Sequence, residues 1–377
     1  MVARSYPKGL ENRAPRTENR GDGVWFLVLS FWFFLGAMLR FAIPSKGSLY
    51  DNTLSFLESS GLKVSRPNPR QYTARIKALP GVEVLLHRPA DIVQKVAAGD
   101  IDIGITGLDL VAELAIDDPN VVIADEDLGF GGVDLVLAVP EAWVDVQSWR
   151  DLADLAAEWA AEGRQLRIAT KYQNQVRAFC HRQGINVFTL VDSQGATEAA
   201  PALGYADLIA DITETGTTFR ENRLKIVAGT TMLRSQACLI VGRRALNDAP
   251  AKLATVKSIL ELVEARRRAR GFAQVIANVP GDSVAEVGQR IVAVPELAGL
   301  QGPTIAPVFD KAGTAGTDDT LRWFSISIVI QSDRTLRAVE HLRALGSTGI
   351  VVLPLHYVFA DRADSFAQLQ TRLQGAE

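Results

Sequence analysis

One stretch of the chain carries the residue types best suited to chemistry: an apolar strand that ends in an acid and runs into a turn of hydroxyl residues. The acid is Asp211, and the turn that follows it consists of Glu214, Thr215, Gly216, Thr217 and Thr218. Backbone N–H groups of such a turn, with hydroxyls beside them, form a concave site for a phosphate. The acid can accept hydrogen bonds from sugar hydroxyls, so one loop can hold both ends of a phosphorylated ribose. The pattern also fits an ordinary strand-to-helix connection whose threonines act as caps.

The composition excludes several other classes of protein. With 47% apolar and 22% charged residues, the chain is not a disordered protein. A formal net charge of −3 argues against a surface that coats nucleic acid, so we expect no nucleic-acid partner. The cysteines have no CxxC spacing and the four histidines form no HxxxH pair. Zinc sites and disulfide scaffolds are therefore not predicted, and a reducing, cytoplasmic compartment is expected.

Strands and helices alternate beyond the first forty residues, which is typical of a layered α/β architecture. A strand at 39–43 leads into a helix near 49–60. Pro89 suits the first turn of a helix that ends at Gly99. The segments from about 140 to 212 form a second α/β unit, which we expect to be inserted in the first.

The C-terminal third follows a different pattern. A helix over 252–270 ends in a cluster of four arginines, which fits either a solvated helix end that complements the helix dipole or a ligand-binding patch. Residues 272 to about 360 then have the order β-α-β-β-α-β, which is the ferredoxin-like pattern. Within it, Asp282 is the expected cap of a helix over 282–294.

The N-terminal residues do not resemble the rest. Residues 1–23 mix basic and acidic side chains without a hydrophobic period, so disorder is expected there. Residues 24–39 form an apolar run of 16 residues, shorter than the ~20 needed to cross a bilayer and without a signal-peptidase site. Three interpretations stay open: an upstream extension from an early start codon, a targeting or membrane-associated leader, and a structural element. We expect residues 1–37 to be dispensable and the protein to have no membrane partner.

Specific motifs connect the chain to a known family. The residues around Asp211 and the turn that follows it have the spacing of the ATP phosphoribosyltransferase signature: Glu198, Gly204, Ala206, Ile209, Asp211, Thr215, Gly216 and Thr218. Segments 43–47, 68–72, 88–92, 104–109 and 302–307 also resemble family segments, in family order. Phe219 departs from the aliphatic residue usual after the two threonines. The resemblance covers about 39–360 and includes the C-terminal domain of the long, self-regulated form.

The resemblance implies an α/β fold with a two-lobed, periplasmic-binding-protein-like catalytic core and a ferredoxin-like C-terminal domain. Catalytic lobe I would comprise 38–134 and 225–250, and lobe II would comprise 135–224. A connecting helix at 251–271 would lead to a regulatory, histidine-binding domain at 272–377.

The resemblance to this family also implies an enzymatic activity. Members of this family join N1 of the ATP adenine to phosphoribosyl pyrophosphate, the first step of histidine biosynthesis, with Mg²⁺ held largely by substrate oxygens. Displacement of pyrophosphate from the anomeric carbon passes through an oxocarbenium-like state. The protein therefore has to position substrates and stabilise charge rather than supply a nucleophile. A sequence without a Ser/His/Asp constellation is consistent with that chemistry.

The resemblance assigns a role to each candidate residue. The turn from Thr215 to Thr218 would hold the 5′-phosphate, and Asp211 and Glu198 would contact the ribose hydroxyls. Glu214, which opens the turn, would also take part in binding the phosphoribosyl group. Other residues would bind the remaining parts of the ligands: Lys46 and Arg88 as fixed cations for pyrophosphate and triphosphate, Asp91, Gly104, Thr106 and Gly107 around ATP or pyrophosphate, and Asn278, Thr304 and Gly349 around histidine. Each has a plainer alternative, such as a turn lysine, a surface ion pair, a solvated acid, a helix first-turn acid or a turn glycine.

Two other functions remain possible on the sequence alone. Two α/β lobes with the chain crossing between them also describe a periplasmic-type solute-binding protein without catalysis. A metabolite sensor built around the ferredoxin-like domain is a third class. The phosphate turn and the acidic sugar site favour the enzyme, which we expect to be a homo-oligomer, either a dimer or a hexamer.

Overall fold

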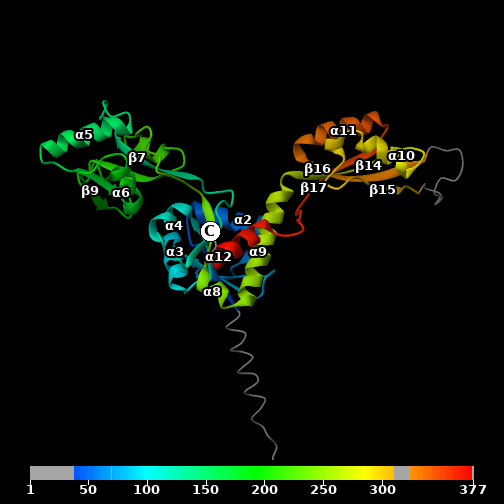
Figure 1. Ribbon diagram of the computed structural model, residues 1–377, viewed down its shortest axis with the longest axis horizontal. Helices are drawn as coiled ribbons and strands as arrows, with labels where there is room; N and C mark the ends of the chain where they lie inside the picture. Colours follow the sequence, from blue (N-terminus) through cyan, green and yellow to red (C-terminus); the bar gives the residue numbers. More distant parts are fainter. Residues whose placement is uncertain (1–37, 69, 310–321, 376–377) are drawn as a thin grey trace, which may run out of the picture. The chain divides into compact units, whose positions relative to one another are not determined.

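The computed structural model describes residues 38–68, 70–309 and 322–375, and the structural statements below refer to these (Figure 1). The predictions for residues 1–37 lie outside them. Within the described ranges, no helix is both long enough and apolar enough to cross a membrane. The chain forms three separate β-sheets, each with its own hydrophobic core.

The first sheet has seven strands in the order β2-β3-β4-β1-β5-β13-β6. Their bounds are Val64–Ser65 (β2), Thr73–Ile76 (β3), Val82–His87 (β4), Leu39–Pro44 (β1), Ile103–Gly107 (β5), Ala237–Gly242 (β13) and Val121–Asp125 (β6). Strand β1 runs parallel to both β4 and β5, so their carboxyl ends meet at one edge of the sheet. Five of the six β1 residues are buried, as expected for a central strand covered on both faces.

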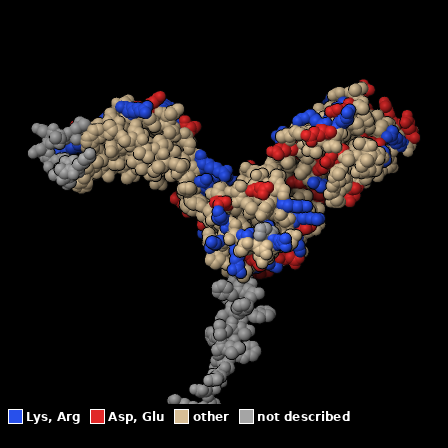
Figure 2. Space-filling model, turned by 180° about the vertical axis from the view of Figure 1, so that it is seen from behind, with Lys and Arg blue, Asp and Glu red and all other residues tan. Residues whose placement is uncertain are grey.

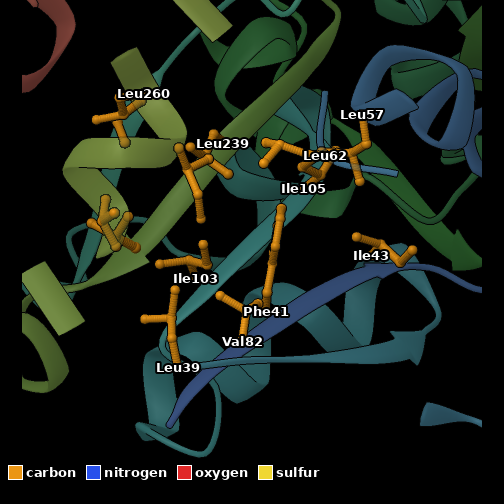
Figure 3. Packing of buried hydrophobic residues seen from close by; sticks show 14 of the residues in the cluster. Leu39, Phe41, Ile43, Leu57, Leu62, Val82, Ile103, Ile105, Leu239 and Leu260 are labelled. Atoms are coloured by element: carbon orange, nitrogen blue, oxygen red, sulfur yellow. The ribbon is translucent and has the colours of Figure 1, made fainter. Parts of the chain in front are cut away.

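Besides the C-terminal helix, five helices accompany this sheet. They are α2 (Ser48–Ser59), α3 (Pro89–Ala98), α4 (Leu108–Leu114), α8 (Arg243–Asn247) and α9 (Pro250–Ala269). On one face, Leu39, Phe41 and Ile43 of β1 pack with Leu57 of α2 and Leu260 of α9 (Figure 3). The opposite face packs against the apolar sides of α3 and α4.

The second sheet has the order β11-β7-β10-β8-β9, with β12 also paired to β7. Its strands are β7 (Val133–Pro140), β8 (Leu166–Thr170), β9 (Phe188–Asp192), β10 (Leu208–Thr213), β11 (Leu224–Ile226) and β12 (Leu233–Ser235). Its helices are α5 (Trp149–Ala161), α6 (Gln173–Arg182), the short 3₁₀ turn η1 (Thr197–Ala199) and α7 (Thr217–Glu221). Residues 225–235 were predicted in lobe I, but β11 and β12 pair with β7, so this segment belongs to the second sheet.

The third sheet is antiparallel, with the order β15-β16-β14-β17. Its elements are β14 (Phe272–Pro280), α10 (Val284–Val292), η2 (Pro295–Leu297), β15 (Thr304–Pro307), β16 (Trp323–Gln331), η3 (Ser332–Arg334), α11 (Thr335–Ala344) and β17 (Thr348–Pro354). This is the ferredoxin-like arrangement. Together with the two α/β lobes it confirms the predicted fold class. The cap of α10 is Ser283 rather than Asp282, because the Ser283 hydroxyl accepts the N–H of Glu286 at 3.1 Å.

The last helix, α12 (Asp364–Gln374), was predicted to belong to the C-terminal domain, but it packs on the first sheet. Leu369 and Leu373 are part of the core cluster under β1. Glu264 of α9 accepts hydrogen bonds from the backbone and hydroxyl of Ser365, and Arg243 donates to the carbonyls of Arg372 and Leu373. Residues of the first lobe thus bind both ends of α12. In the amino-acid sequence, the residues of the third sheet are therefore inserted between two segments of the first lobe.

We predict that Leu369→Ala destabilises the protein by about 2 to 5 kcal/mol, because the fully buried leucine would leave a cavity in the core of the first lobe. The measurement is the free energy of unfolding in denaturant. Leu336→Ala is the matched control, since Leu336 is 77% exposed and should change stability by no more than about 0.5 kcal/mol. Equal effects of the two substitutions would show that α12 does not belong to this core.

Candidate functional site

The predicted phosphate turn lies between the end of β10 at Thr213 and the start of α7 at Thr217. Gly216 has a φ of 72°, a left-handed conformation that favours glycine, and its N–H donates to the Thr213 hydroxyl at 2.8 Å. The hydroxyls of Thr215 and Thr217 lie 2.8 Å apart. The side chains of the turn are exposed while Gly216 is buried, so the hydroxyls are open to a ligand.

Arg220, which the sequence analysis did not single out, braces this turn. Its guanidinium donates to the Thr215 carbonyl at 3.3 Å and to the Thr217 hydroxyl at 3.1 Å. A signal for it was present, since Arg220 stands one helical turn after Gly216. A cation held beside a turn of N–H and hydroxyl groups increases the affinity of that turn for an anion.

Asp211 is half-buried near the end of β10, the strand that leads into the turn. Its Oδ1 accepts the N–H of Ile212 at 2.8 Å and lies 3.8 Å from Nζ of Lys171. Burial raises the pKa of the Asp211 carboxyl, and the negative charge of Glu198 adds to this rise. The positive charge of Lys171 opposes the rise, as do hydrogen bonds from Ile212 and Thr197. The 3₁₀ turn η1 contacts β10, so the structure brings the two predicted ribose contacts, Glu198 and Asp211, into one neighbourhood.

Lys46 and Arg88 lie at neighbouring carboxyl ends in the first sheet. Lys46 is in the loop after β1 and Arg88 directly follows β4, whose His87 pairs with Pro44 of β1. Both cations are exposed, and Arg88 is the N-cap residue of α3, with Pro89 at the first helical position as predicted. The carboxyl edge of parallel strands is where open α/β sheets bind ligands. Asp91 is half-buried in the first turn of α3.

Gly104, Thr106 and Gly107, predicted near ATP, have packing roles in this structure. A Cβ at Gly104 would lie 2.3 Å from Cγ2 of Ile92, so glycine lets α3 pack on β5. A Cβ at Gly107 would meet the carboxylate of Asp109. Thr106 is fully buried and donates to the carbonyl of Pro89 at 2.9 Å. These contacts account for the residue types without a ligand, and contact with ATP stays a prediction.

We predict that Gly104→Ala destabilises the protein by about 1 to 3 kcal/mol, because the added methyl group overpacks the contact with Ile92. The KM for ATP should change little. Unfolding free energy and steady-state kinetics would be measured on the same variant. A large rise in KM at unchanged stability would contradict the packing role and support direct contact with ATP.

A buried hydrogen-bond network joins the second sheet to α4 of the first lobe. The Tyr172 hydroxyl, at the start of α6, donates to Oδ2 of Asp109 at 2.5 Å, and the Ser235 hydroxyl donates to Oδ1 at 2.7 Å. Asp109, in the first turn of α4, therefore accepts hydrogen bonds from two other parts of the chain. Burial, followed by the charge of Asp109, raises the pKa of Tyr172, so the phenol keeps its proton. Glu113 accepts the N–H groups of Asn174 and Gln175 in the same region.

The three predicted effector residues lie on one sheet but not at one point. Asn278 of β14 is adjacent to Gly349 of β17, where a Cβ would be 3.8 Å from the Asn278 side-chain nitrogen. Gly349 has a φ of 61°. Thr304, on edge strand β15, pairs with Ser327 of β16 and is two strands away from Asn278. The structure thus brings together two of the three.

One face of the third sheet packs against helices, and the opposite face is called the outward face here. Among the described residues that pair with a neighbouring strand, none on the outward face is charged. The core face packs against α10 and α11, while the other face includes Gln274, Ile276, Asn278, Thr304, Ala306, Ser325, Ser327, Val329, Val351 and Leu353. In Figure 2 this part of the chain, beside the grey segment at the left, presents a broad area without charged side chains. Val351 is 47% and Leu353 is 41% exposed, so no described element covers this edge of the face.

Comparison with known proteins shows the family of the chain. The family model "HisG: ATP phosphoribosyltransferase" matches residues 88–265, and the model of its C-terminal domain matches 269–357. The chain is 40% identical over 337 residues to ATP phosphoribosyltransferase 2, chloroplastic, of Arabidopsis thaliana, covering 89% of this chain and 80% of that protein.

It is also 35% identical to the ATP phosphoribosyltransferase of Bradyrhizobium sp., covering 89% of this chain and 98% of that protein. Among solved structures, the ATP phosphoribosyl transferase (HisG:HisZ) complex from Thermotoga maritima matches with a TM-score of 0.45 and 25% identity. That match covers 60% of this chain and 99% of the matched chain. By its sequence matches over most of its length, the chain belongs to the ATP phosphoribosyltransferase family.

Proposed function

We propose that this protein joins N1 of the ATP adenine to phosphoribosyl pyrophosphate, giving N1-(5-phosphoribosyl)-ATP and pyrophosphate, and so catalyses the first step of histidine biosynthesis. One observation supports this above the others: the half-buried carboxylate of Asp211 stands near the end of the strand that leads into an open turn of hydroxyl and N–H groups. Asp211 would contact the ribose hydroxyls, together with Glu198, while the turn from Thr215 to Thr218 receives the 5′-phosphate.

The proposed mechanism depends on stabilisation of the positive charge that forms on the ribose. As pyrophosphate leaves, positive charge develops on the ribose ring, and a fixed carboxylate beside the sugar stabilises that charge. Asp211 suits this role because its partly buried position strengthens electrostatic interactions relative to water. Lys46 and Arg88, exposed at the carboxyl edge of the first sheet, would bind the phosphate chains of the leaving group and of ATP.

Mg²⁺ enters this proposal as part of the substrates. Among the described residues, no group of three or more His, Cys, Asp or Glu side chains is placed to hold a metal ion. The donors near the phosphate turn are hydroxyls, N–H groups and Arg220, which suit phosphate oxygens rather than a bare cation. The ion would be carried by the pyrophosphate and triphosphate oxygens and would neutralise part of their charge.

We further propose that the C-terminal domain binds histidine and that the enzyme is a homo-oligomer. The neighbouring positions of Asn278 and Gly349 support an effector contact at that point of the sheet. The uncharged outward face supports self-association, because a contiguous uncharged and partly apolar surface is typical of an interface. Whether the assembly is a dimer or a hexamer would be read from its mass in solution.

The test of the activity is direct. Purified protein is mixed with ATP, phosphoribosyl pyrophosphate and Mg²⁺, and the absorbance of the N1-ribosylated adenine is followed. We expect product only when all three components are present, and less of it when histidine is added. Tight binding of a small molecule without any turnover would favour the solute-binding alternative instead.

A further inference from the structure

We propose that Lys171 is a positioning residue for the reaction: its ammonium group keeps the Asp211 carboxylate negatively charged and aimed at the ribose. This inference rests on the proposed function and deepens it. Lys171 lies in the connection between β8 and α6, outside the motifs that indicated the family. Its side chain is 33% exposed and that of Asp211 is 18% exposed, so the pair is partly shielded from water.

The register of the second sheet explains why these two residues meet. Strands β8 and β10 run parallel, with Ile168 beside Leu208 and Ala169 beside Ile209. Continuing that register by two residues brings Lys171 level with Asp211. The observed distance of 3.8 Å from Nζ to Oδ1 agrees with this placement.

The backbone at Lys171 is held firmly on its C-terminal side. The next residue, Tyr172, is fully buried, and its hydroxyl donates to Asp109 while its N–H donates to the Thr170 hydroxyl at 2.9 Å. The Lys171 ammonium lies 5.0 Å from the centre of the Tyr172 ring, which restrains the long side chain further. Tyr172 thereby anchors the start of the lysine side chain, and its ring contacts the other end.

The charges around Asp211 explain why a cation is needed there. The negative charge of Glu198, in η1, disfavours a second negative charge on Asp211, and burial also disfavours ionisation of the Asp211 carboxyl. Lys171 is the cation that acts against both effects, aided by the Ile212 N–H and the Thr197 hydroxyl. At 3.8 Å the ammonium is beyond hydrogen-bond length, so it supplies charge without occupying the acceptor that a sugar hydroxyl would use.

The pH dependence of kcat/KM for phosphoribosyl pyrophosphate tests this inference. In the folded enzyme, removing Lys171 raises the pKa of Asp211, so the carboxylate is lost at a higher pH on the acid side. The acid limb of the profile is the fall in kcat/KM toward low pH. We expect Lys171→Met to move this limb to higher pH by about one unit, so that kcat/KM is about tenfold lower than in the wild type at a pH below the limb. Lys171→Arg should restore the wild-type limb.

Two controls separate positioning from a structural role. Lys63→Met removes an exposed lysine whose partner is the exposed Glu58, and it should leave the profile unchanged. In an Asp211→Asn background, Lys171→Met should move no acid limb, because the amide does not titrate. An unmoved limb in Lys171→Met, or an equal loss at every pH, would overturn this inference in an enzyme that is active. An inactive wild-type protein would overturn the proposed function itself.

Discussion

Replacing Asp211 by asparagine is expected to lower kcat by about 100-fold or more, while the KM for ATP changes far less. The substitution keeps the shape of the side chain and removes its charge. Because the carboxylate stands beside the predicted ribose position, that charge matters most as pyrophosphate leaves and the sugar becomes positive. Steady-state kinetics with each substrate varied in turn, on protein of unchanged unfolding temperature, would measure the effect.

Asp192→Asn is the matched control for this experiment. Asp192 likewise lies at the C-terminal part of a strand of the second sheet, β9, but it is exposed, with a hydrogen bond from the Gln194 side chain at 2.8 Å. We expect near-normal kcat for this variant. Near-normal turnover in Asp211→Asn, or an equal rise in both KM values without a fall in kcat, would rule out Asp211 as the residue that stabilises the transition state.

Deleting the third sheet and its helices is expected to abolish inhibition by histidine and leave catalysis in place. The deletion would remove residues 272–354 and join Gly271 to Leu355 through a short flexible linker. The structure favours this design because the cut ends are close: Ala273 pairs with Pro354, and Arg266 donates to the carbonyls of Leu355 and His356. Activity would be measured with and without histidine, alongside histidine binding by calorimetry.

The physical reason is linkage. If histidine inhibits from a distance, it binds the low-activity conformation more tightly, and by reciprocity substrates that favour the active state weaken histidine binding. Removing the effector domain removes both effects. Inhibition that persists in an active deletion variant would place the effector in the catalytic lobes.

Truncation after Gly271 is the informative comparison. It removes the same sheet but also removes α12, whose Leu369 and Leu373 complete the core of the first lobe. We expect this shorter protein to unfold at a lower temperature than the internal deletion, because the first lobe would lose buried apolar contacts. Similar stability of the two variants would show that α12 contributes little to that lobe.

The amino-acid sequence by itself determined the features that depend on local pattern. Alternation of apolar and polar residues predicted the strands, and Pro89 and Gly99 marked the two ends of a helix, because periodicity and backbone preference act over a few residues. The order β-α-β-β-α-β was likewise readable, and the third sheet has it. The turn after Asp211 was visible because its chemistry is contiguous in the chain.

Tertiary structure alone decided the contacts between residues far apart in sequence. Nothing in the local pattern around Asp364 shows that α12 packs on the first sheet, since an amphipathic helix can cover any apolar face of the right size. Burial decides the role of Gly104, because only the packed structure shows that Ile92 fills the space above it. The pairing of Lys171 with Asp211 depends on the register of β8 against β10, which is set by long-range hydrogen bonds and shared core packing rather than by either strand alone.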